Sequence, residues 1–274
     1  MTWIPRRRAL RRAAVVFAAL ALGHFVAVLA RVSISGPFDW LISLGSAETV
    51  ETLRVPADGM RRVVVLQHGM WRTAAALNRI ERTLRAHGFE VWNVGYPSLR
   101  GTIEQHAERL RDTVEQIHRT PVDELFFVGH SMGGLVIEEY LRRPDARQPT
   151  RCVYVAVPHR GALLADLRKH WFLFRWVMGD LAALQLSPGD PLHQRPLPWP
   201  ERSGAIVGDV GVGNPSIPGD DDGTVAVDEA RLPGARDTIV VPYGHTRIAL
   251  ADDVAIQVVR FCRAGAFSHE VPPR

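Results

Sequence analysis

ELFFVGHSMGG, residues 124–134, joins a short apolar run to a serine flanked by glycines. The run 124–128 predicts a buried strand, and residues 133–142 predict a helix directly after it. Between them, the pattern Gly-x-Ser-x-Gly puts Ser131 on a tight strand-to-helix turn, where glycines leave room for the chain to cross. This arrangement is typical of a nucleophilic serine. The alternative is a glycine-rich turn whose serine only caps the helix.

Strands and helices alternate on both sides of this segment. Apolar runs predict strands at 62–67, 89–95, 152–156, 204–207 and 237–241, and further stretches predict helices at 76–87, 103–117 and 249–262. Near-continuous apolar strands separated by helices are typical of a parallel sheet covered on both faces. We therefore expect an α/β fold with a mostly parallel central sheet. Residues 31–60 are predicted to be a linker that includes one further edge strand.

The stretch 162–203 interrupts this alternation. It contains an aromatic segment with Trp171 and Phe174, followed by proline-rich sequence up to Pro200. A large apolar side chain left in water forgoes about 1.5–3 kcal/mol, so this segment must bury against the body, a ligand or a membrane. We expect a cap or lid over a substrate pocket, with Trp171 and Phe174 contacting the substrate. An extra layer of core is the alternative.

The uncharged stretch AAVVFAALALGHFVAVLA, residues 13–30, follows the basic cluster PRRRALRR at 5–12. A helix of this length reaches about 27 Å, close to the hydrocarbon core of a bilayer. The basic flank predicts that this end stays in the cytoplasm while the rest lies outside. We expect residues 1–30 to be a signal anchor that holds the domain 61–274 on the periplasmic or extracellular side. A cleaved signal peptide with secretion, or a buried helix, is the alternative.

Composition excludes several other classes of protein. Without the five arginines of residues 1–30, the net charge of +4 becomes −1, so a nucleic-acid partner is not expected. Cys152 and Cys262 are too few and too far apart for a disulfide scaffold or a zinc module. An oxidising compartment would allow them to pair, but two buried free thiols are the favoured expectation.

Ser131 requires a base and an acid, which follow the nucleophile along the chain in this type of fold. His245 lies just past the last predicted strand, whereas His269 lies beyond the closing helix. The acid is expected from DDDGTV, residues 220–225, with Asp222 preferred and Asp221 in reserve. A solvated acidic turn or a calcium site is the alternative reading of this run.

Negative charge that develops on the substrate requires two backbone N–H donors. One is expected from Met132, directly after the nucleophile, and the other from Met70 in the loop after the strand 62–67. The helix that starts behind Ser131 adds positive potential at the same point.

These motifs together resemble bacterial lipases and esterases of the α/β-hydrolase fold over residues 62–262. The resemblance rests on HGM at 68–70, GHSMGG at 129–134, PHRG at 158–161, DGTV at 222–225 and GHT at 244–246. It implies that Ser131, Asp222 and His245 form a catalytic triad and that 162–203 caps the acyl pocket. The chain departs from the family at 155–157, which read Val-Ala-Val instead of a Gly-Thr before Pro-His, and at Ala162, where a small hydroxyl residue is usual.

The expected activity is a serine hydrolase that cleaves lipid-like or small acyl esters without a cofactor or a metal. The same triad would also serve an acyltransferase, a thioesterase or an amidase. A non-catalytic lipid-binding protein on this fold would be expected to have a broken triad. A structural protein whose residues 171–181 bind a partner is the remaining alternative.

Overall fold

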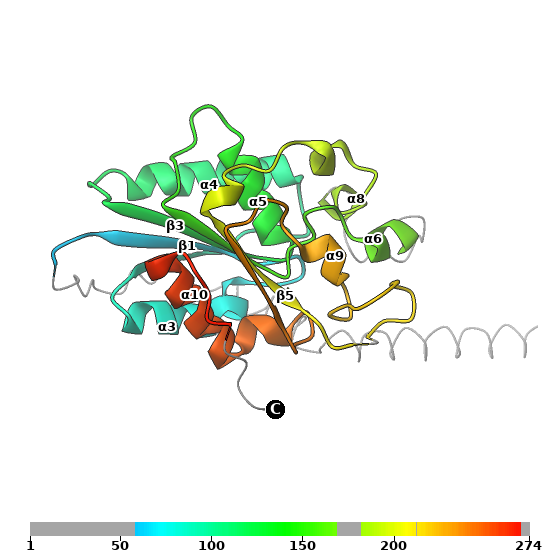
Figure 1. The fold of residues 1–274 in the computed structure, drawn as a ribbon. Helices are drawn as coiled ribbons and strands as arrows, with labels where there is room; N and C mark the ends of the chain where they lie inside the picture. Colours follow the sequence, from blue (N-terminus) through cyan, green and yellow to red (C-terminus); the bar gives the residue numbers. More distant parts are fainter. Residues whose placement is uncertain (1–57, 169–181, 212, 270–274) are drawn as a thin grey trace, which may run out of the picture. The chain divides into compact units, whose positions relative to one another are not determined.

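The structure, a computed structural model, describes residues 58–168, 182–211 and 213–269. Its centre is a six-stranded sheet in the order β2-β1-β3-β4-β5-β6, with every neighbouring pair parallel (Figure 1). The strands are β1 (Arg62–Gln67), β2 (Glu90–Val94), β3 (Glu124–His130), β4 (Arg151–Val155), β5 (Ser203–Gly208) and β6 (Asp237–Val241). The predicted parallel α/β architecture is therefore confirmed.

Helices cover both faces of this sheet. The long ones are α3 (Asn78–Ala86), α4 (Ile103–Ile117), α5 (Met132–Leu141) and α10 (Asp252–Ala264). Helices α4 and α5 pack together on one face, and α3 and α10 pack together on the other (Figure 1). Along β1, Val63 and Val65 belong to one core cluster, while Val64 and Leu66 belong to the other. Burial on both faces explains why the strands read as continuous apolar runs.

Two helices begin differently from the sequence prediction. The predicted helix 76–87 opens as the 3-10 helix η1 (Ala74–Leu77) before α3 starts. The predicted helix 249–262 is wrong at its start, because a second 3-10 helix, η4 (Arg247–Leu250), is separated from α10 by Ala251. Ala251 has extended backbone angles (φ −80°, ψ 138°), which end the first turn. Asp252 and Asp253 then place negative charge at the α10 N-terminus, where the helix dipole favours it.

The strand order fixes where a ligand can meet the sheet. The chain runs from β1 outward to β2 and then crosses back to β3 on the other side of β1. In parallel sheets of this kind, the loops after two such diverging strands open a crevice at the carboxyl ends. The loops that follow β1 and β3 therefore border a natural site.

Several predicted segments lie outside the described residues. They are the anchor at 13–30, most of the linker 31–60, and residues 169–181 with Trp171 and Phe174. Residues 58–60, the part of the linker that is described, form no strand. Among the described helices, none has both the length and the apolar character needed to cross a bilayer.

Cys152 in β4 and Cys262 in α10 are both free, buried thiols. Burial raises the pKa of the Cys262 thiol to about 12. The alternative of a disulfide between them is therefore not realised in the structure.

Candidate active site

Ser131 lies between β3 and α5 in a conformation that L-residues rarely adopt, with φ 54° and ψ −131°. Its N–H donates a 3.0 Å hydrogen bond to the carbonyl of Val155 in the neighbouring strand. The start of α5 crosses the end of β1 so closely that a Cβ on Gly133 would lie 2.2 Å from the carbonyl oxygen of Gln67. Glycine is therefore required there for the strand-to-helix turn to form.

Ser131, His245 and Asp222 form one chain of hydrogen bonds. Ser131 Oγ lies 2.9 Å from His245 Nε2, and His245 Nδ1 lies 2.7 Å from Asp222 Oδ2. Both distances are within the range expected for a nucleophile, a base and a carboxylate that orients the base. The His245 side chain is 15% exposed and that of Asp222 is 1% exposed. The imidazole is therefore partly accessible to solvent, whereas the carboxylate that it contacts is shielded from water.

A tight turn after β5 aims the Asp222 carboxylate. Its Oδ1 accepts the backbone N–H groups of Thr224 (2.9 Å) and Val225 (2.8 Å), which leaves Oδ2 for His245. Asp221 points elsewhere, because its carboxylate accepts the N–H groups of Asn214 and Gly223. The structure therefore brings Asp222, and not Asp221, to His245.

The loop that carries His245 is fixed on several sides. The His245 N–H donates to the carbonyl of Asp222 at 2.8 Å, so the acid and the base share a backbone contact as well. Arg72, in the loop after β1, donates to Thr246 Oγ1 at 2.6 Å. The end of β5 packs just behind, since a Cβ on Gly208 would lie 2.8 Å from that of Asp222. A glycine at the end of β5 therefore permits this close assembly.

The two predicted oxyanion donors come from segments that meet next to Ser131. Met132 begins α5, and no acceptor among the described residues takes its amide or that of Met70. The loop that carries Met70 runs against the nucleophile, because a Cβ on the preceding Gly69 would lie 2.9 Å from Ser131 Cβ. The N-terminus of α5 adds a positive dipole potential. This arrangement suits the stabilisation of a developing oxyanion.

Two neighbours of the triad were missed by the sequence analysis. His130 donates from Nε2 to the carbonyl of His245 at 2.8 Å, and Arg72 holds Thr246. His130 is inside the Gly-x-Ser-x-Gly motif, so its position next to Ser131 is the sequence signal that could have indicated this contact. Arg72 belongs to no motif, and nothing in its spacing indicated this contact.

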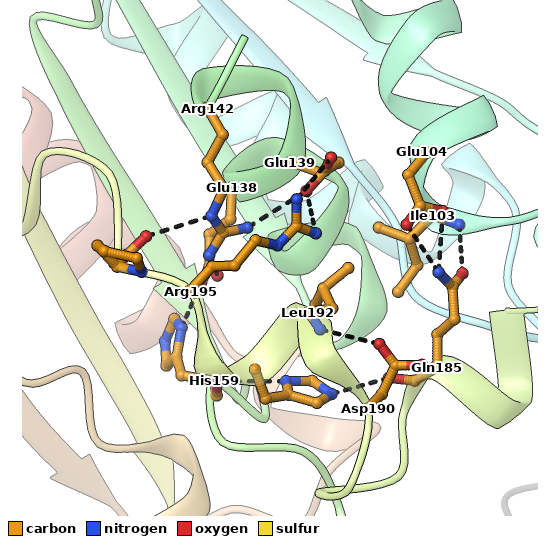
Figure 2. Close-up of polar contacts among 12 residues, drawn as sticks. Ile103, Glu104, Glu138, Glu139, Arg142, His159, Gln185, Asp190, Leu192 and Arg195 are labelled. Atoms are coloured by element: carbon orange, nitrogen blue, oxygen red, sulfur yellow. Dashed lines mark hydrogen bonds and ion pairs between the residues drawn. The ribbon is translucent and has the colours of Figure 1, made fainter.

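The described parts of the insertion 162–203 are attached to α4 and α5 (Figure 2). They contain α6 (Leu163–Arg168), α8 (Ala182–Gln185), and the 3-10 helices η2 (Pro191–Gln194) and η3 (Pro200–Arg202). Gln185 accepts the Ile103 N–H at 2.7 Å and donates to Glu104. Arg195 pairs with Glu139 of α5 at 2.7 Å. The base of the insertion is thus fastened to the helices on one face of the sheet.

A buried ionic cluster lies beneath this attachment. Glu138 of α5 is 1% exposed, and it contacts His159 Nδ1 at 2.5 Å and Arg142 at 3.2 Å (Figure 2). His159 also stacks edge-on against Tyr154, with ring centroids 5.0 Å apart. This cluster joins the helix behind Ser131 to the PHRG segment at 158–161.

A separate cavity of about 440 Å³ is lined by residues at the other end of the sheet, including Arg62, Glu124 and Cys262. Arg62 forms ion pairs there with Asp58 and Glu124. None of the triad residues lines it, so we do not assign the chemistry to this cavity.

Comparison with known proteins agrees with the fold. A family model described as "Alpha/beta hydrolase family" matches residues 63–272. No curated protein matches the sequence.

Solved structures share the fold at low sequence identity. The mature form of a Bacillus licheniformis lipase is 18% identical, with a TM-score of 0.58 over 76% of this chain and 94% of that chain. A metagenomic carboxyl esterase is 16% identical, with a TM-score of 0.57 over 81% of this chain and 80% of that one. A phospholipase from Legionella pneumophila is 12% identical, with a TM-score of 0.59 over 75% of this chain and 60% of that one. At these identities the likeness is one of fold.

Proposed function

The chain belongs to the alpha/beta hydrolase family, and on that premise we propose that it is a serine hydrolase of carboxylic esters. The observation that carries this proposal is the hydrogen-bonded series from Ser131 through His245 to Asp222, with distances of 2.9 and 2.7 Å. Fold likeness to a lipase and a carboxyl esterase supports an ester as the substrate.

The first half of the proposed reaction forms an acyl-enzyme. Ser131 Oγ attacks the acyl carbonyl carbon while His245 Nε2 takes the hydroxyl proton. Asp222 accepts the Nδ1–H of the imidazole, which fixes the tautomer and stabilises the imidazolium. The amides of Met70 and Met132 donate to the oxyanion. When the carbonyl re-forms, the ester C–O bond breaks and His245 returns the proton to the leaving alcohol.

Water completes the cycle by the same route. His245 removes a proton from a water molecule that attacks the acyl carbon, and the oxyanion again forms between the two amides. The bond to Ser131 Oγ then breaks, the serine recovers its proton from His245, and the carboxylic acid leaves. The triad and the two amides suffice for every step.

The substrate pocket and the location are proposed from the sequence. Residues 162–203 would cap the acyl group through Trp171 and Phe174, since their apolar side chains require a buried partner. Residues 13–30 would anchor the domain on the outer side of a membrane, because their length and basic flank fit a signal anchor. Fractionation of cells followed by external protease treatment tests this location, and release of the full chain with the cytosol contradicts it.

Labelling by a fluorophosphonate probe tests the catalytic proposal directly. The full-length chain should be labelled at Ser131 and should hydrolyse p-nitrophenyl esters of graded chain length. Addition of an alcohol acceptor distinguishes hydrolysis from acyl transfer by the product that forms. A protein that is folded but neither labelled nor active on any ester contradicts the proposal.

A further inference from the structure

His130 occupies a central position among the segments that meet at Ser131. It is the last residue of β3 and directly precedes the nucleophile, and it is only 3% exposed. Its ring lies beside that of His245, with centroids 5.1 Å apart. On the oxyanion side, a Cβ on Gly69 would lie 3.3 Å from His130 Nδ1. One imidazole therefore contacts both the loop of the base and the loop of an oxyanion donor.

The hydrogen bond that His130 makes determines its tautomer. Nε2 lies 2.8 Å from the carbonyl oxygen of His245, which only accepts, so Nε2 must carry the proton. Burial first, and then the charge of the nearby His245, lowers the pKa of His130 to about 3. The ring is therefore neutral over the range in which an imidazole base works. It adds no second positive charge beside His245.

Packing alone does not account for a histidine at this position. In the neutral tautomer, Nδ1 is a buried acceptor, and it has no hydrogen-bond partner among the described residues. Leaving a buried polar atom unpaired opposes stability. A leucine or a methionine would fill a similar volume without that penalty. The feature that an apolar residue would lack is the donor to His245.

We propose that His130 is a positioning residue whose Nε2–H holds the backbone carbonyl of His245 and thereby sets the imidazole against Ser131. This inference rests on the proposed function of Ser131 and His245. The N–H of His245 is held by the carbonyl of Asp222 and its C=O by His130, so both backbone groups of the base are fixed. Because His130 and Ser131 are adjacent, this hydrogen bond fixes the position of His245 relative to β3 and to Ser131 at its end.

Three substitutions at one position isolate the donor. His130→Gln places an amide N–H at the distance of Nε2, whereas His130→Asn carries the same amide one methylene shorter. His130→Leu fills volume without any donor, and it keeps the test available if the asparagine variant does not fold. His106→Asn is the matched control, because His106 is a buried histidine that contacts Tyr96 and not the triad.

The experiment measures kcat and KM for p-nitrophenyl butyrate across a range of pH in the full-length protein. The concentration of active sites, to which kcat refers, is determined by titration with fluorophosphonate. We expect the asparagine and leucine variants to lose about 10–100-fold in kcat at unchanged KM, since a displacement on the order of 1 Å has that effect. The glutamine variant should stay within about threefold of wild type because its donor persists. The midpoint of the pH profile should not move, since His130 does not itself titrate in the working range.

Three results would overturn this inference. They are wild-type kcat per titrated site in both His130→Asn and His130→Leu, equal losses in all three His130 variants, and a shifted midpoint with an unchanged plateau. Wild-type protein that fluorophosphonate does not label would refute the proposed function, and the role of His130 with it. The three results that overturn the role of His130 leave fluorophosphonate labelling intact, so they can be distinguished from a failure of the proposed function.

Discussion

The backbone N–H of Ser131 reaches across to the carbonyl of Val155 and forms a 3.0 Å hydrogen bond with it. This bond continues the pairing of β3 with β4 for one residue past His130, whose partner in the register is also Val155. Ser131 is therefore held by the sheet while its own φ of 54° is unfavourable for an L-residue. The surrounding structure imposes the conformation that exposes the hydroxyl.

Removing the Ser131 hydroxyl should abolish turnover without unfolding the protein. We expect Ser131→Ala to lose on the order of 10⁴-fold or more in kcat, because no other group on this strand-to-helix turn can replace the serine hydroxyl as the nucleophile. Ser131→Gly should be equally inactive but about 1 kcal/mol more stable than the alanine variant, since glycine accepts this backbone conformation. Ester hydrolysis and urea unfolding measure the two effects. Residual wild-type activity in either variant refutes the assignment of the nucleophile.

The two neighbouring aspartates should separate catalysis from loop stability. Asp222→Asn should lose on the order of 10⁴-fold in kcat, because an amide no longer selects the His245 tautomer. Asp221→Asn should retain most of kcat per labelled site but unfold at lower urea, since its carboxylate organises the turn through Asn214 and Gly223. A reversal of the two kinetic results would show that Asp221 is the acid.

Buried histidines should make the protein sensitive to acid. Burial lowers the pKa of His68 and of His106 to about 4, below the ordinary value of 6.5. Their neutral forms are favoured by the folded state, so this stability is complete above about pH 6.5 and is lost as the pH falls toward 4. His106→Phe keeps the edge contact with Tyr96 and removes one titrating group. Urea unfolding between pH 7 and 5 gives the slope of the free energy of unfolding against pH, which should be smaller by about one proton in this variant. An unchanged slope contradicts the assignment.

The buried carboxylate of Glu138 should matter more for stability than its neighbour on the same helix. Glu138→Ala leaves His159 without its carboxylate partner and removes one of the two carboxylates that pair with Arg142, and we expect a loss of about 3–5 kcal/mol. Glu139→Ala is the matched control, with an expected loss of at most about 1 kcal/mol. Equal losses in urea unfolding would show that the buried cluster has no special role. The kcat per labelled site should change little in both variants.

The proposed cap predicts an effect that depends on acyl chain length. Replacing Trp171 and Phe174 with Ala should raise KM for long-chain esters more than for acetyl esters, because a longer acyl group buries more apolar surface. Leu167→Ala, at an exposed residue of α6, serves as the control with no expected preference. An equal loss for all chain lengths that follows a fall in Tm would support the core alternative.

The fold could be predicted because the central strands β1, β3, β4 and β5 bury both faces, while α3, α4 and α10 bury one face each. The predicted ends of helices were less accurate where tertiary contacts decide them. One example is Ala251, whose extended backbone separates η4 from α10. Among the site residues, the order of Ser131, an aspartate and His245 followed from chain order. The choice of Asp222 over Asp221 depends on a turn in which adjacent carboxylates face different partners, and spacing alone does not determine that.

The contact between His130 and the carbonyl of His245 joins residues 115 positions apart. It requires the end of β3 and the loop after β6 to meet at the carboxyl end of the sheet. No periodicity or local motif encodes such a distance, because it depends on the strand order and on the path of two loops. Contacts of this kind therefore cannot be predicted from a local sequence pattern and are seen only in the structure.

The order of the site residues along the chain also determines when the complete site can form. Ser131 follows β3, whereas Asp222 and His245 follow β5 and β6, which are added last at one side of the sheet. The nucleophile precedes its base by 114 residues, so a nascent chain displays the serine well before the imidazole that activates it has been synthesised. In the proposed mechanism, a chain that ends before His245 therefore has a serine without the base that activates it. Because Ser131 lies in one part of the chain and Asp222 and His245 in another, the chain could be divided into two fragments. Turnover would then report that the two fragments have assembled.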